Sequence, residues 1–145
     1  MMREKTKWRI FRILNILIPL LLGSAIYISM TDDTFISRWV RSAVAWEVDA
    51  VIRPDPGILR LLRNYLCDIC WAYSMVFCVA WILGDGSVSL AVAVSICVLF
   101  SSLMEFLQLC AAIPGTFDVW DILLEIVSCL IAGMVIYTKI WRKRK

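Results

Sequence analysis

The stretch Met104–Glu125, MEFLQLCAAIPGTFDVWDILLE, places four carboxylates and a glutamine on either side of one short turn. Its flanks are so apolar that both predict membrane helices. A charged side chain inside a bilayer costs about 3 kcal/mol or more unless it faces a partner, a cavity or water. The polar residues of this stretch are therefore candidates for a functional site: Glu105, Gln108, Asp118, Asp121 and Glu125.

The composition predicts an all-α, polytopic membrane protein. The chain has 145 residues, of which 61% are hydrophobic, and it contains no histidine. Soluble domains average about 45–50% apolar residues. Four apolar runs come near the ~20 residues that a helix needs to cross a bilayer. A single membrane domain over residues 1–145 accounts for them, with spans at about 10–30, 66–83, 88–113 and 119–140.

The basic residues predict the orientation of the bundle. Five Lys or Arg residues precede or open the first apolar run, and five more close the chain from Lys139 onward. Basic segments stay in the cytoplasm, so we expect both termini there. The first run is too long for a secretory signal core and predicts an uncleaved helix. Because these charges set topology and meet anionic headgroups, the net charge of +3 predicts membrane lipids and not nucleic acid as partners.

The external segment, residues 31–65, predicts an amphipathic helix in the outer membrane interface. From Ile36 onward, apolar residues recur with the spacing of one helical face. Glu47 falls on that apolar face. It either extends to the headgroups or points toward the polar site.

Polar residues of three spans are expected to converge at the outer end of the bundle. Asp68 lies near the outer end of the second span, four residues after Asn64. Residues three or four apart share a helix face, which aligns Glu105 with Gln108 and Asp121 with Glu125. The rim of the predicted pocket comprises Arg60, Arg63, Asn64 and Glu47. Helix capping and interhelical hydrogen bonds are the structural alternative.

Two kinds of chemistry suit these residues. Crowded carboxylates can hold one protonated acid beside an ionised base, and oxygen ligands suit a hard divalent cation. The residues leave open whether any reaction is catalysed. Cys67 and Cys70 form a CDIC motif at the same end, so a membrane thiol oxidoreductase is a further alternative. Against it, a C-x-x-C inside a helical pattern lacks the context of redox motifs, which favours buried packing cysteines.

The block Glu105–Gly133, EFLQLCAAIPGTFDVWDILLEIVSCLIAG, resembles the VanZ-like family, whose pattern is Glu-x-x-Gln, a short turn, then Asp-x-x-Asp and a small-residue helix. The segment Arg63–Ser74, RNYLCDICWAYS, also resembles that family. Many members have an arginine in the external turn, which this chain lacks, and Asn and Gly where it has Glu125 and Ser128 or Cys129. The positions that match the family are Asp68, Glu105, Gln108, Asp118 and Asp121.

The resemblance implies a protein of the bacterial plasma membrane. It also implies a link to the cell envelope or to resistance to the glycopeptide teicoplanin. We expect an outward-facing acidic pocket that binds a cation or a polar envelope headgroup, such as that of an envelope precursor or a glycopeptide-related ligand. The alternative is a structural or interaction subunit without pocket chemistry. The sequence predicts no particular oligomeric state.

Overall fold

A computed structural model describes residues 2–30, 65–84, 86–113 and 117–142, and these residues form helices and turns with no strand. The helices are α1 (Met2–Met30), α4 (Cys67–Leu83), α5 (Ser87–Leu109) and α6 (Val119–Arg142). Three helical segments are long and apolar enough to cross a membrane, namely Thr6–Ile26, Ser87–Leu109 and Val119–Ile140, and α4 is a shorter apolar helix. The external amphipathic helix predicted from Ile36 lies outside the described residues.

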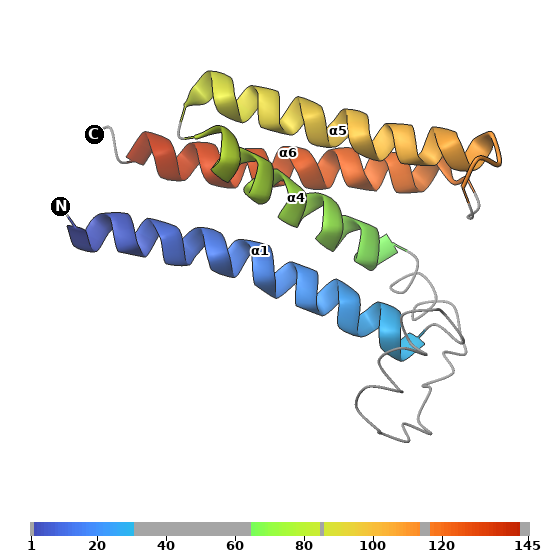
Figure 1. Cartoon of the computed structure of the whole chain (residues 1–145), viewed down its shortest axis with the longest axis horizontal. Coiled ribbons are helices and arrows are strands. Elements are labelled where there is room, and N and C mark those ends of the chain that lie inside the picture. Colours follow the sequence, from blue (N-terminus) through green and yellow to red (C-terminus); the bar gives the residue numbers. More distant parts are fainter. Residues whose placement is uncertain (1, 31–64, 85, 114–116, 143–145) are drawn as a thin grey trace.

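Helix α4 is central to the bundle. It contacts α1 on one side and both α5 and α6 on the other (Figure 1). The α1–α4 contact is fixed by polar side chains as well as by packing. Tyr73 donates to Asn15 Oδ1 at 2.8 Å, and the Ser74 hydroxyl donates to the carbonyl of Ile16 at 3.1 Å. On the other side, the Ser128 hydroxyl of α6 donates to the carbonyl of Ile69 at 2.7 Å.

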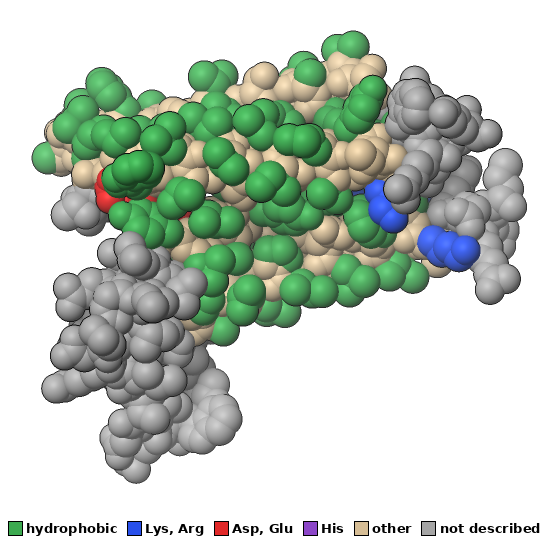
Figure 2. All heavy atoms as spheres, turned by 180° about the vertical axis from the view of Figure 1, so that it is seen from behind, with side chains coloured by type: hydrophobic (Ala, Val, Ile, Leu, Met, Phe, Trp, Pro, Cys, Tyr) green, Lys and Arg blue, Asp and Glu red, His purple; other side chains and the backbone are tan. Residues whose placement is uncertain are grey.

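The core is narrow and the outer surface is apolar. Val76, Phe77, Cys97 and Cys129 are fully buried, and Phe77 of α4 also packs against Phe11 of α1. Many large apolar side chains are exposed along all four helices, and Figure 2 shows them spread over one face of the bundle. In a soluble protein such a surface would expose apolar patches far larger than monomers usually carry. The described residues therefore form a helical membrane-embedded protein.

Charge is segregated between the two ends of the bundle. Both chain termini lie at the end where α4 finishes and α5 begins, and the α5–α6 connection lies at the opposite end (Figure 1). Lys and Arg side chains gather at the terminal end, whereas Asp and Glu side chains lie at the other (Figure 2). We call these the basic end and the acidic end.

The third helix ends earlier than the sequence indicated. Its apolar run continues to Ile113, but α5 ends at Leu109. The amide of Ala112 donates to the carbonyl of Leu107, and that of Ala111 to Gln108, while Ala111 has φ +54°. This is the Schellman pattern that terminates helices, and hydropathy cannot reveal it because an alanine occupies the left-handed position usually held by glycine.

Ala111→Gly should therefore stabilise the protein. A left-handed conformation costs a non-glycine residue about 1–2 kcal/mol, so the glycine should raise the free energy of unfolding by about 1 kcal/mol. Ala91→Gly, on the exposed face of α5, should instead lower it by about 1 kcal/mol. Denaturation of the purified protein in detergent measures both. Equal destabilisation by the two glycines would contradict this assignment.

Candidate functional site

Four carboxylates from α4, α5 and α6, and a fifth from the residue before α6, converge at the acidic end, and we call them the acidic cluster: Asp68, Glu105, Asp118, Asp121 and Glu125. Asp68 lies close enough to Glu105 for their charges to repel each other. Asp121 has the same relation to Asp68, Glu105 and Asp118. Glu125 interacts electrostatically with Asp68, Glu105 and Asp121. The five carboxylates that the sequence analysis assigned to the pocket, apart from those of its rim, therefore lie together in the structure.

Glu105 is the buried centre of this arrangement, with only 6% of its surface exposed. One carboxylate oxygen accepts a hydrogen bond from Gln108 Nε2 at 3.2 Å. The other accepts from the backbone amide of Asp118 at 3.4 Å. Because Asp118 directly precedes α6, this contact ties the last turn of α5 to the start of the next helix. Glu105 therefore has partners for both of its oxygens.

Asp118 caps helix α6. Its Oδ1 accepts the amide of Trp120 at 2.9 Å, the geometry in which a side chain satisfies one of the free amides of a helix start. Its Oδ2 accepts the hydroxyl of Tyr65 at 3.0 Å, from the turn before α4. Capping therefore explains the position of Asp118, in agreement with the structural alternative to a functional pocket given in the sequence analysis.

Asp121 and Glu125 differ from Glu105 and Asp118 in their hydrogen bonding. Both lie within α6, on turns that face α4 and α5. Asp121 Oδ1 and Glu125 Oε2 are buried and have no hydrogen-bond partner within the described residues. Ser101 of α5 lies near the Glu125 carboxyl, but Glu125 Oε2 still has no donor within the described residues. A buried acceptor without a partner costs about 1–3 kcal/mol. The inner part of the cluster is therefore open to an additional donor.

The structure describes only part of the other residues that the sequence analysis singled out. Arg60, Arg63, Asn64 and Glu47, the expected rim, lie outside the described residues. Cys67 and Cys70 occupy the first turn of α4, and an ideal Cβ on Gly23 of α1 would lie 3.1 Å from Cys70 Cβ. This pair therefore packs against α1. All six cysteines carry free thiols. The described residues contain no group of three His, Cys, Asp or Glu side chains arranged to hold a metal ion.

Two polar side chains that lie at the site, those of Ser101 and Tyr65, were not identified from the sequence. Ser101 lies four residues before Glu105, on the same helix face, so its spacing carried a signal. Tyr65 lies next to Asn64 at the end of the external segment, and no local pattern pairs it with a residue 53 positions away.

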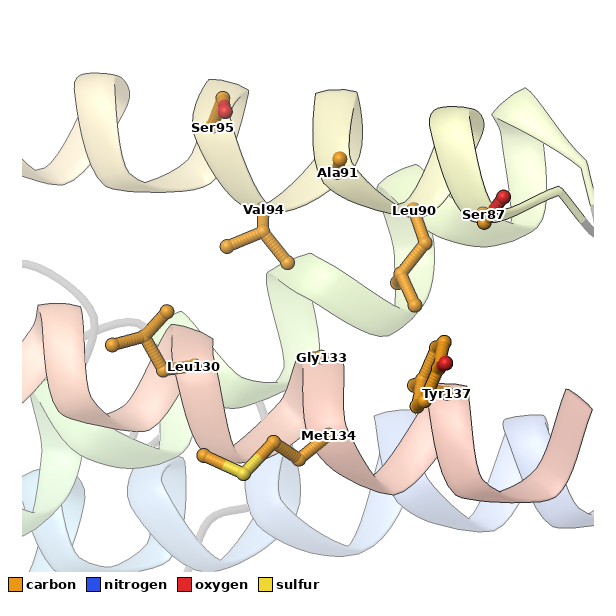
Figure 3. A pocket seen from close by; sticks show the side chains of 9 residues that line it. All are labelled: Ser87, Leu90, Ala91, Val94, Ser95, Leu130, Gly133, Met134 and Tyr137. Carbon is orange, nitrogen blue, oxygen red and sulfur yellow. The ribbon is translucent and has the colours of Figure 1, made fainter. Parts of the chain in front are cut away.

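A groove on the described surface lies away from the acidic cluster. A groove of 460 Å³ runs between α5 and α6 near the basic end (Figure 3). Its apolar lining includes Leu90, Val94, Leu130 and Met134, and Ser87 and Tyr137 lie at one end of it. Gly133 allows the helices to approach there, since a Cβ on it would lie 2.9 Å from Val94 Cγ2. The groove contains no charged residue and is separate from the acidic cluster.

Fold and site together define a helical membrane protein with a cluster of buried and partly buried carboxylates at one end. Searches of protein-family models, of curated proteins and of solved structures find no match to this chain. Its function therefore has to be argued from its own residues.

The Tyr65–Asp118 hydrogen bond should appear in the titration of the tyrosine. This bond is the largest cause that raises the pKa of Tyr65 above its ordinary value of 10.0, since a phenolate would lie beside the Asp118 carboxylate. A group whose pKa is raised in the folded state contributes stability that is complete below its unfolded-state pKa. That contribution is lost as the pH rises through the folded-state value.

We expect the difference between the alkaline absorbance titrations of the wild type and Tyr65→Phe to show one phenol that ionises above pH 10. In an Asp118→Asn background the same difference should shift to lower pH, because the carboxylate is gone. An unchanged difference titration in that background would show that Asp118 does not hold Tyr65.

Proposed function

We propose that this protein is a VanZ-like protein of the bacterial plasma membrane with four spans and both termini in the cytoplasm. In this proposal, the acidic cluster faces outward and binds a cation or the polar headgroup of an envelope component. Helix α4 has 17 residues, which is the lower limit of the range of about 17–25 for a spanning helix. The gathering of Lys and Arg at the terminal end supports the orientation, because basic ends remain in the cytoplasm (Figure 2).

The observation that carries the proposal is the pair of unsatisfied oxygens on Asp121 and Glu125. Two buried acceptors without donors, close to further carboxylates, lower the stability of the protein. They form no hydrogen bond that would offset this cost. A ligand that donates hydrogen bonds or carries positive charge would satisfy both. The site therefore favours a partner with a cationic or hydroxyl-bearing group.

Among such partners, the geometry favours a headgroup over a bare metal ion. A divalent cation requires six or more oxygen ligands in a shell close around it. The described carboxylates lie at several depths, from Asp118 just before α6 to Glu125 seven residues further on, and so extend over about 10 Å along the helix. An ammonium- or hydroxyl-bearing headgroup can meet acceptors spread over such a length. An envelope precursor or a glycopeptide-related ligand would have this chemistry.

The second candidate is a structural or interaction subunit, and a specific observation favours it. Both Glu105 oxygens have partners inside the bundle, and Asp118 caps α6. These bonds hold α5 to α6 without any ligand. The two candidates differ at Asp121 and Glu125, which the structural role leaves unexplained. The thiol oxidoreductase remains the third alternative, and loss of activity in Cys67→Ser and Cys70→Ser would support it.

Asp121→Asn and Glu125→Gln should each stabilise the protein while abolishing its function. Each substitution removes one buried charge from a crowded set and adds an amide donor, so the free energy of unfolding should rise by about 1 kcal/mol. Glu105→Gln is the matched control. It replaces an acceptor that has a partner with a donor, and should lower the free energy of unfolding by about 1–2 kcal/mol.

Thermal unfolding in detergent measures stability. Growth of a deletion strain that carries each variant, under teicoplanin and under envelope stress, measures function. Ethanolamine and Mg²⁺, added separately to the purified protein, probe an ammonium headgroup and a metal ion. If Asp121→Asn and Glu125→Gln destabilise the protein as Glu105→Gln does, and leave growth unchanged, the cluster is structural and the binding proposal is wrong.

A further inference from the structure

The groove between α5 and α6 has one wall of small side chains and one of long side chains. It has a volume of 460 Å³ and lies near the basic end (Figure 3). The wall on α5 includes Ser87, Ala91 and Ser95, which are one turn apart and all exposed. The facing wall on α6 includes Leu130 and Met134. The small residues of α5 leave a space that the long side chains of α6 do not fill.

The groove leads from one membrane interface into the hydrocarbon region. Its two walls belong to the segments Ser87–Leu109 and Val119–Ile140, which are long and apolar enough to cross a membrane. Ser87 begins the first of these segments, and Tyr137 lies three residues before the end of the second. Ser95 is eight residues further in than Ser87, or about 12 Å along α5.

The polarity of the lining changes along the groove. At the interface end, Ser87 and Tyr137 are exposed, and neither hydroxyl has a hydrogen-bond partner within the described residues (Figure 3). Both hydroxyls are therefore available as donors. Further in, the lining is apolar apart from Ser95, and a serine within a helix can bond the carbonyl one turn earlier. No lining residue carries a charge, so the part of a ligand that enters the groove has to be uncharged as well.

The dimensions of the groove favour a hydrocarbon chain over a helix. Spread over about 12 Å of α5, its volume of 460 Å³ corresponds to a mean cross-section of about 40 Å². A helix with its side chains is about 10–12 Å across, which is a cross-section of about 80–110 Å². A second helix therefore cannot enter the groove, and an unfilled space would deprive its walls of dispersion contacts. A single flexible chain can fill it, and Met134 can adapt to such a chain.

We propose that this groove is a binding site for one acyl chain of a glycerophospholipid, whose ester carbonyl accepts hydrogen bonds from Tyr137 and Ser87. The acyl chain is apolar and uncharged, as the inner lining requires, and its ester group lies at the interface, where the two hydroxyls are. Entry of the chain brings no hydrophobic gain, because its other surroundings are lipid chains of the same polarity. The hydrogen bonds and the filling of the groove distinguish the bound lipid from its neighbours.

A photoactivatable phosphatidylcholine in vesicles of dioleoylphosphatidylcholine tests this proposal on the full chain. The probe carries a diazirine halfway along one acyl chain, and mass spectrometry maps the adducts formed on illumination. Leu130 lines the groove, whereas Ile131 does not, and both side chains are 47% exposed at the same depth of α6. We expect adducts on Leu130 to exceed those on Ile131 several-fold. A second probe, with the diazirine next to the ester, should label Tyr137 instead.

Two variants test the groove and its hydroxyls separately. Ala91→Leu places a larger side chain in the groove from the exposed face of α5, and should reduce the adducts on Leu130 to the level of those on Ile131. Ala25→Leu, on the exposed face of α1, is the matched control and should leave them unchanged. Tyr137→Phe should raise the probe concentration that gives half-maximal labelling of Leu130 about threefold, the effect of one hydrogen bond within a bilayer.

Equal labelling of Leu130 and Ile131 in the wild type would show that the groove meets only bulk lipid, and the proposal would be wrong. Undiminished labelling of Leu130 in Ala91→Leu would contradict it too. Light scattering in detergent tests the other occupant, a second copy of this chain. A wild-type dimer that Ala91→Leu converts to a monomer would assign the groove to that second copy. The comparison of Leu130 with Ile131 uses the wild type, so it decides the question even if a variant fails to fold.

Discussion

The absence of hydrogen-bond partners in a hydrocarbon environment is the constraint on which this structure depends. A polar group within the spans has to find its partner inside the bundle. The fold meets this demand with side chains that donate to carbonyls of a neighbouring helix. Ser74 bonds the carbonyl of Ile16, and Ser128 bonds that of Ile69, so α4 is held on both sides. These bonds set the relative positions of the helices, and the positions of the carboxylates follow from them.

The two ends of the bundle meet the same constraint with opposite charges. At the acidic end, carboxylates of α4, α5 and α6 lie close together. Backbone amides and the Tyr65 hydroxyl donate hydrogen bonds to two of the carboxylates at this end, those of Glu105 and Asp118. At the basic end, Arg12 lies over the ring of Trp8 and Lys139 over that of Phe11, and such contacts stabilise positive charge. Such a charge gradient along a bundle favours one orientation in the membrane.

Much of this arrangement could be predicted from the sequence, because apolar length and the placement of charge follow simple rules. The convergence of Asp68, Glu105 and Asp121 followed from spacing and from the short turn between two spans. The end of α5 could not be predicted, since the Schellman turn at Ala111 depends on a backbone conformation that alanine rarely adopts. Neither could Tyr65, whose partner is remote in sequence, nor the stacking of Trp8 on Phe11 beneath two cations. The four-span count and the family resemblance remain predictions.

The contrast between Glu105 and Glu125 bears most directly on the proposed function. Both are glutamates on helix faces that point into the bundle at the acidic end. Glu105 has donors for both oxygens, whereas Glu125 has one oxygen that is buried and without a partner. A network that served only to hold helices together would gain by replacing the unsatisfied carboxylates with amides or apolar groups. Sites that bind a ligand keep such groups, because the ligand supplies the missing donors and the stability lost in its absence is recovered on binding.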